Sequence, residues 1–297
     1  MRIPPKIYIV LGALLLTAAL YSVYYNLLFL PKLLLLMTLG ALLEAAVMKI
    51  QNKPLRAYGF GSAFAAGLLT CSLPATMPLW QLTIGIAFAA LIVKPIFPKA
   101  GLRFNSALTA RLLLMLLFPA DCTAWGVPTI DTLSAATPQE LYRAEGAFLD
   151  PMLLLLGPIQ GSWMDFYTLV PGSPGSNLPL LLIILFIVLS WQKITNLPTA
   201  LAYALSFSLV NTLCGLNPLY NLITASSLFC MTFLFSDPYS TPKSRNARIL
   251  FGLIIGLANG LIRTQTYYTE AIVFAVLIAN LFTPLLDRQL PPPERTP

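Results

Sequence analysis

Histidine is absent from the 297-residue sequence, and charged residues make up only 10% of it. Without histidine, the chain cannot assemble a Ser-His-Asp or Cys-His set for nucleophilic catalysis. The phosphate-binding pattern G-x-x-x-x-G-K-[ST] does not occur either. These absences exclude the hydrolases that depend on a histidine base and the P-loop nucleotide hydrolases.

Cysteine is also scarce, and no two cysteines have C-x-x-C spacing. Because metal and cluster sites are built mainly from cysteine and histidine, we expect no zinc, haem or iron–sulfur site made by this chain alone. The cysteines are instead expected to be small buried thiols. They are Cys71, Cys122, Cys214 and Cys230.

The chain is rich in apolar residues, which make up 57% of it and give a mean hydropathy of +0.78. Soluble domains carry about 25% charged residues, far above the fraction here. A net charge of +7 would suit a nucleic-acid partner if it formed a basic face, but the lysines and arginines are scattered at the edges of apolar runs. The composition therefore predicts an integral membrane protein in contact with lipid, with no nucleic acid bound.

Apolar runs bounded by charges, proline or asparagine predict about ten spanning helices in two sets of five. Residues 1–297 would then form a single all-α polytopic membrane domain. The first run, which follows "MRIPPK", is long enough to be a retained spanning helix rather than a signal peptide. The two sets cover residues 7–25, 32–49, 58–74, 78–96 and 105–120, and residues 178–192, 195–212, 218–236, 248–263 and 270–286.

Two of these segments resemble each other, "GSAFAAGLLTCSLP" in the first set and "ITASSLFCMTFLFSDP" in the second. Both are rich in small residues and both end at a proline. Because five is an odd number, repeats of five helices would be inverted across the membrane. This similarity is the basis for considering two inverted five-helix repeats.

The positive charges predict the orientation, because cytoplasmic loops collect lysine and arginine. With the N-terminus inside, cytoplasmic segments contain 14 of the 18 basic residues, and an even number of helices returns the C-terminus to the cytoplasm. Residues 121–177 then form an extracytoplasmic loop that carries six of the eleven acids. Within it, "PMLLLLGPIQGSW" is too short to cross and is expected to lie at the interface or to re-enter partway.

This loop contains the pattern D-x-x-S-x-A-T, formed by Asp131, Ser134, Ala136 and Thr137. Taken alone, serine and threonine before a proline are turn residues, and Asp131 could cap a short helix.

Together with other segments, the pattern resembles the flavinylation motif of the RnfD/NqrB family. This family comprises membrane subunits of the Rnf ion-translocating electron-transport complex and of the sodium-translocating NADH:quinone reductase. The resemblance covers nearly the whole chain. The matching segments are "GLRFNSALTARLLL", "GSPGSNLP", "FSDPYSTP" and "YYTEAIVFAVLIANLFTPLLD", in the order that the family has them.

The resemblance implies that Thr137 receives FMN through a phosphoester bond, made by a separate flavin transferase that uses FAD. Asp131 and Ser134 would be recognition and positioning groups for this step. It further implies a non-covalent riboflavin, partner subunits of an Rnf-type complex, and a place in the bacterial inner membrane. The chain would pass electrons between those subunits while the complex moves Na⁺ or H⁺.

Two alternatives remain open at this stage. One is an ion or small-solute transporter or channel without a flavin. The other is an assembly partner that has lost flavin attachment, since the sequence departs from the family at three positions. Ala135 stands in place of a glycine, Ser106 in place of a proline, and Ser176 in place of a glutamate.

Polar groups within the predicted helices carry further expectations. Glu44 and Arg111 either pair or line an ion path, or lie near an interface and reach water. Glu270 and Asp237 are expected to make structural polar contacts. The small-residue spacing of Gly252, Gly256 and Gly260 predicts close helix packing, internal rather than against a partner.

Overall fold

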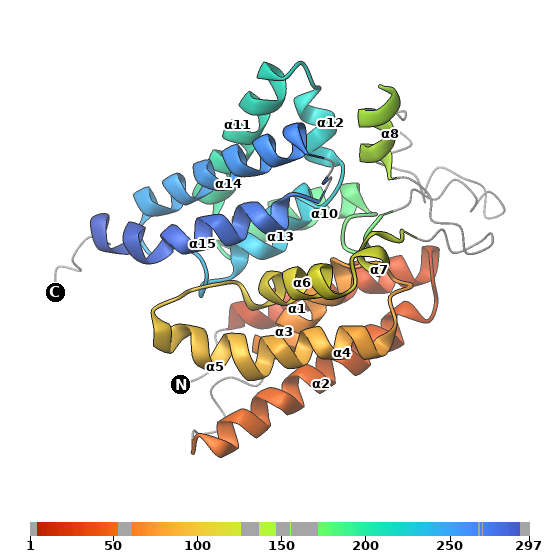
Figure 1. The fold of residues 1–297 in the computed structure, drawn as a ribbon, viewed down its shortest axis with the longest axis vertical. Helices are drawn as coiled ribbons and strands as arrows, with labels where there is room; N and C mark the ends of the chain where they lie inside the picture. The colour runs from red at the N-terminus through yellow and green to blue at the C-terminus, as the bar shows by residue number, and fades with distance from the viewer. Residues whose placement is uncertain are drawn as a thin grey trace.

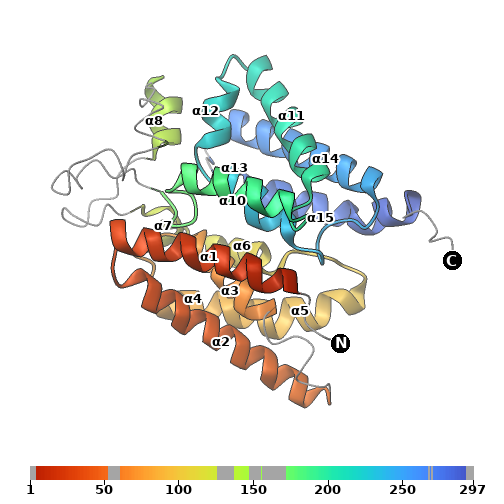
Figure 2. The same cartoon turned by 180° about the vertical axis from the view of Figure 1, so that it is seen from behind.

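The computed structural model describes residues 5–52, 61–125, 137–146, 155, 172–266, 268 and 270–291. Within these residues the regular structure is helical throughout, without a strand. The prediction of an all-α polytopic membrane protein is confirmed. Figures 1 and 2 show two layers, with α1–α7 in one and α10–α15 in the other.

The first layer contains the helices from the N-terminal part of the chain. They are α1 (Pro5–Tyr24), α2 (Phe29–Ile50), α3 (Gly61–Cys71), α4 (Leu79–Phe88) with its continuation through η2, α5 and η3 to Ala100, α6 (Ser106–Leu117) and α7 (Pro119–Thr123).

The second layer and the short helix α8 beside it come from the rest of the chain. They are α8 (Pro138–Glu145), α10 (Pro179–Trp191), α11 (Leu197–Leu213), α12 (Pro218–Ile223), α13 (Ser227–Phe233) with η5 to Ser236, α14 (Arg245–Gln265) and α15 (Ile272–Gln289). Helix α6 packs against α15, and α1 against α10, so both pairs join the layers.

Five of the described helical segments are long and apolar enough to cross a membrane: α1, α2, the continuous helix from α4 to Ala100, α14 and α15. Five shorter apolar helices accompany them: α3, α6, α10, α11 and α13 with η5. At a rise of 1.5 Å per residue, a helix of 11 residues such as α3 spans about 16 Å, roughly half of the hydrocarbon core. Such helices cross the bilayer only together with the segments that adjoin them.

The segment predicted as one helix over 218–236 is broken between α12 and α13. Ala225 lies at the break with a φ of 55°, in the left-handed region that interrupts a helix. Helix α3 likewise ends at Cys71, before the predicted end at residue 74, because Pro74 follows closely. The two similar segments are thus both short helices, and the inverted repeat stays a prediction.

Basic residues gather at one end of the molecule. Lys6 Nζ donates to the Lys193 carbonyl at 3.1 Å, and Arg103 forms an ion pair with Asp287. The Lys243 backbone N–H donates to the same Asp287 carboxylate at 2.7 Å. Helix α1 begins and α15 ends on this side, away from α8 (Figures 1 and 2). Four of the residues counted as cytoplasmic, Lys6, Arg103, Lys193 and Lys243, thus lie at the end of the molecule away from α8, and the orientation in the membrane stays a prediction.

Close packing of α11 against α14 depends on the predicted glycines. A Cβ on Gly256 would overlap Ser206 Oγ and lie 2.5 Å from the Tyr203 carbonyl oxygen, while a Cβ on Gly260 would lie 2.7 Å from Val210 Cβ. Because these contacts are within the chain, the prediction of internal packing is confirmed.

The cysteines divide into two kinds. Cys71, Cys122 and Cys230 are buried, as expected. For Cys214 the expectation is wrong, since this thiol is exposed. It follows the last residue of α11 as its C-cap and so lies beyond the packed part of the helix.

Candidate functional site

Thr137 is the N-cap of α8 and forms a capping box with Glu140. The Glu140 backbone N–H donates to Thr137 Oγ1 at 3.3 Å, and the Thr137 N–H donates to the Glu140 carboxylate at 2.7 Å. The sequence T-P-Q-E from residue 137 has the S/T-x-x-E spacing of this motif, so the cap was readable from the sequence. Only 7% of Thr137 is exposed.

Gln139 fastens the beginning of α8 to α12 and the break that follows it. Its Nε2 donates to Asn221 Oδ1 at 2.6 Å, and the Thr224 hydroxyl donates to its Oε1 at 2.5 Å. The Tyr220 hydroxyl donates to the Pro138 carbonyl at 3.3 Å. Gln139 and Asn221 are both fully buried, so these bonds are shielded from water.

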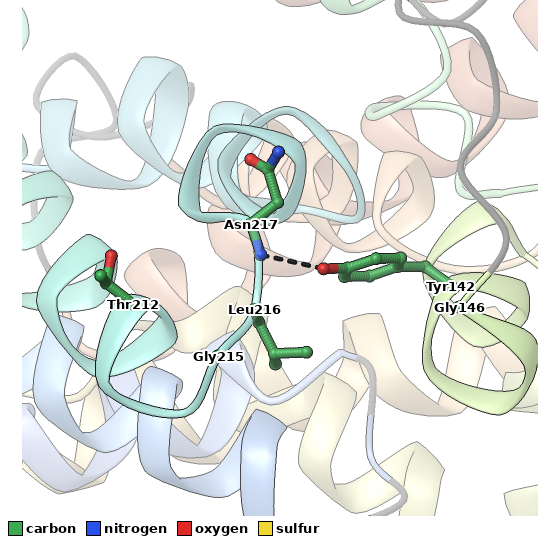
Figure 3. Close-up of a pocket in the computed structure, with 6 residues that line it drawn as sticks. All are labelled: Tyr142, Gly146, Thr212, Gly215, Leu216 and Asn217. Carbon is green, nitrogen blue, oxygen red and sulfur yellow. Dashed lines mark hydrogen bonds between the residues drawn. The ribbon is translucent and has the colours of Figure 1, made fainter.

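The other end of α8 is held by two further contacts. The Tyr142 hydroxyl accepts a hydrogen bond from the Asn217 N–H at 2.9 Å (Figure 3), and Arg143 donates to the Thr266 carbonyl. Beside the first contact lies an open groove of about 630 Å³ between α8 and the turn from α11 to α12. Its lining, drawn in Figure 3, consists of Tyr142, Gly146, Thr212, Gly215, Leu216 and Asn217.

Thr137 also lines a small cavity of about 30 Å³, which has room for about one water molecule. Ser176, at the position where the resembling family has a glutamate, and Glu270 both border it. Ser176 Oγ lies 2.8 Å from Ser173 Oγ. The remaining lining residues are Pro138, Gly172, Asn177, Pro179, Ile223, Thr224 and Ala225.

Glu270 connects the cavity to the first layer. Arg111 of α6 places Nη2 3.3 Å from the Glu270 carboxylate, which also accepts a hydrogen bond from the Ser226 hydroxyl. The Arg111 side chain is only 2% exposed. Since a buried charge is costly unless it is paired, this ion pair holds α6 against the α14–α15 turn and the break before α13.

The ionisable groups inside the helices are paired, as one interpretation of the sequence predicts. Arg111 pairs with Glu270, and Glu44 pairs with Lys94 at 2.9 Å. The Ser62 N–H also donates to Glu44, at 2.7 Å. Structural contacts are confirmed for Asp237 as well, which accepts from Asn105 Nδ2 at 3.0 Å.

Arg263 lies in the last turn of α14, close to the helix end that the sequence predicts, and it is a buried cation. It is 0% exposed, its Nη1 donates to the Asn221 carbonyl at 2.8 Å, and its guanidinium lies 5.1 Å from the Phe207 ring centroid. Asn221 thus bonds both Gln139 and Arg263, and it links α8 to the buried face of α14. No sequence motif marks this link, because its members are far apart in the chain.

Of the three predicted site residues, the structure places Thr137, whereas Asp131 and Ser134 lie outside the described residues. The hydroxyl of Thr137 suits a phosphoester. The space beside it does not suit a flavin, because ligand pockets measure about 300–1,000 Å³ and this cavity measures about 30 Å³. With α8 docked as observed, the cavity at Thr137 does not hold the ring.

Known proteins are similar to this sequence over most of its length. A subunit of an ion-translocating oxidoreductase complex from Shewanella piezotolerans is 28% identical over 306 residues, covering 89% of this chain and 85% of that protein. A Na(+)-translocating NADH-quinone reductase subunit of Klebsiella pneumoniae is 34% identical, with 74% and 57% covered. A subunit of the Na(+)-translocating ferredoxin:NAD(+) oxidoreductase complex of Acetobacterium woodii is 28% identical, with 82% and 76% covered.

A family model described as NQR2, RnfD, RnfE matches residues 3–294. This match spans nearly the whole chain and agrees with the resemblance seen in the sequence. The chain belongs to the NQR2, RnfD, RnfE family.

Proposed function

We propose that the chain is the membrane flavoprotein subunit of an ion-translocating electron-transport complex, with FMN attached to Thr137. Its relatives are named as subunits of ion-translocating oxidoreductase complexes, which supports the complex as the setting. The main observation in support of covalent FMN is the position of Thr137. It lies in the family's motif and on α8, away from the basic end of the molecule.

Attachment is a group transfer from FAD in the active site of a flavin transferase. Thr137 Oγ1 attacks the phosphorus of the FMN half, an Oγ–P bond forms, and the P–O–P bond of FAD breaks. AMP leaves with the bridging oxygen, and the hydroxyl proton passes to a base. Asp131 and Ser134 serve the transferase as recognition and positioning groups, and Ala135 and Ala136 leave the approach unobstructed.

The attached group would supply one- or two-electron transfer, and its tether would keep it from diffusing away. In the unmodified protein, Gln139 binds α8 to α12, and the Arg111–Glu270 pair fixes α6 beside the cavity that Thr137 lines. A non-covalent riboflavin, the partner subunits, and the coupling of electron flow to Na⁺ or H⁺ belong to the same proposal.

The proposed membrane is the bacterial inner membrane, with both termini in the cytoplasm and α8 outside. Cys214 provides a native probe of this orientation, because it is exposed and follows α11 at the end opposite Lys193. The other thiols are buried, and burial raises the pKa of the Cys122 thiol to about 11, which keeps it unreactive.

We expect a membrane-impermeant maleimide added to intact spheroplasts to label the wild-type protein at Cys214. A Cys214→Ser variant should remain unlabelled under the same conditions. Labelling that occurs only after the membrane is permeabilised would reverse the proposed orientation.

The flavin itself is tested by Thr137→Val, which keeps the shape of the side chain and removes the acceptor oxygen. Wild-type protein produced together with its transferase should fluoresce under ultraviolet light on a denaturing gel, and Thr137→Val should be dark. Thr212→Val serves as the control, because Thr212 is an exposed threonine near the same end and should leave the band fluorescent. A dark wild-type band would favour a transporter or channel without a flavin.

A further inference from the structure

We propose that docking of α8 and attachment of the flavin exclude each other, so that the transferase acts on the protein only while α8 is released. This inference rests on the proposed function. On this proposal, α12 and the transferase compete for the segment around Thr137.

The exclusion follows first from space. Thr137 is 7% exposed and opens onto a cavity of about 30 Å³. The phosphorus of FAD must come within bonding distance of Oγ1 while still carrying both the flavin and the AMP. Neither group fits between Thr137, Thr224 and Glu270 as they are placed, so Oγ1 has to leave the cavity before it can react.

The contacts that must break are few and lie along one helix. Gln139 makes two bonds to Asn221 and Thr224, Pro138 accepts one from Tyr220, and Tyr142 accepts one from Asn217. Arg143 donates one to the Thr266 carbonyl, and the rings of Tyr142 and Tyr220 pack against each other. None of these bonds joins two transmembrane helices of the core to each other. Helix α8 can therefore swing out without opening the packing between α11 and α14.

The product of the transfer opposes the return of α8. A phosphodiester on Oγ1 adds a negative charge to the residue whose N–H donates to the Glu140 carboxylate at 2.7 Å. Like charges so placed disrupt the contact between them. The added charge beside the Glu140 carboxylate weakens the capping box of the unmodified protein, and the bulk of the attached flavin keeps its segment out of the cavity of about 30 Å³.

The rate of attachment tests the release step. Full-length, unmodified protein in detergent is mixed with transferase and FAD, and covalent flavin is followed by gel fluorescence. Gln139→Ala should raise the initial rate roughly tenfold, because two buried hydrogen bonds that dock α8 are removed. Tyr142→Phe removes the acceptor of the Asn217 N–H and keeps the ring, so it should give a smaller increase, which covers the case in which Gln139→Ala does not fold.

Gln81→Ala is the matched control. Gln81 is also a buried glutamine with a 2.6 Å side-chain bond, but it lies in α4 and its bond is to Asp121 rather than to the elements that dock α8. The initial rate of flavin attachment in Gln81→Ala should equal that of the wild type. Equal rates for wild type, Gln139→Ala and Tyr142→Phe would overturn the inference while leaving the proposed function standing, whereas no covalent flavin in any of them would overturn both.

Hydrogen–deuterium exchange tests the docking of α8 without relying on the rate of flavin attachment. Amides of residues 139–146 should be protected in unmodified protein and should exchange at least about tenfold faster once the flavin is attached. Equal protection in the two forms would show that α8 stays docked after modification and would contradict the exclusion.

Discussion

Replacing Glu270 with alanine is expected to lower the free energy of unfolding by about 3–5 kcal/mol, because it leaves the Arg111 guanidinium buried without its carboxylate. The Arg111 side chain is 2% exposed, and that of Glu270 is 12% exposed. Removal of one member of such a pair costs more than removal of both, since the remaining charge keeps its desolvation penalty. The measurement is denaturant-induced unfolding of the purified protein in detergent.

A double-mutant cycle isolates the pair. Its single variants are Arg111→Met and Glu270→Ala, and the two combined should recover most of the stability lost in Glu270→Ala, because no unpaired charge remains. Lys99→Met, which removes an exposed cation from the other end of the molecule, should leave the unfolding curve unchanged. If the double variant were as unstable as the sum of its single variants, the ion pair would not join the layers.

The second large effect is expected at the contact of α11 with α14. Gly256→Leu should destabilise the protein by about 3 kcal/mol, at the upper end of overpacking costs, because even a Cβ would lie 2.5 Å from the Tyr203 carbonyl. That carbonyl belongs to the backbone of α11 and cannot move without the helix. Thermal unfolding in detergent measures the loss.

Gly12→Ala is the corresponding control, because a Cβ there meets no atom within 4 Å. In the middle of α1, alanine should keep or slightly raise stability through its better helix propensity. If Gly256→Leu behaved like Gly12→Ala, the close approach of α11 to α14 would not be present in the protein.

Much of the fold could be predicted from the sequence, because lipid demands long apolar helices and the runs that form them are easy to recognise. The break between α12 and α13 could not be predicted. Ala225 carries no signal for the left-handed conformation that it adopts, and no proline or glycine marks the break beside it. Interruptions of this kind depend on tertiary contacts such as the bond from Thr224 to Gln139.

The candidate site was partly predictable. The pattern around Thr137 was evident, and its spacing to Glu140 also contained the capping box. The partners of Gln139 and Arg111 were not evident, because they lie 82 and 159 residues away along the chain. Arg263 follows an apolar run and lies in the last turn of α14, as predicted, but the sequence does not show that Asn221 and Ser227 are its polar partners inside the protein. The burial of Arg263 could not be predicted from the sequence, because these partners were not known.

Covalent flavin at Thr137 is tested most directly by mass spectrometry of the peptide that contains residues 131–140, taken from protein produced together with a flavin transferase. We predict that this peptide carries the mass of one FMN, attached through a phosphoester at Thr137. A peptide that always has its unmodified mass, from protein otherwise folded and present in the membrane, would contradict the central claim.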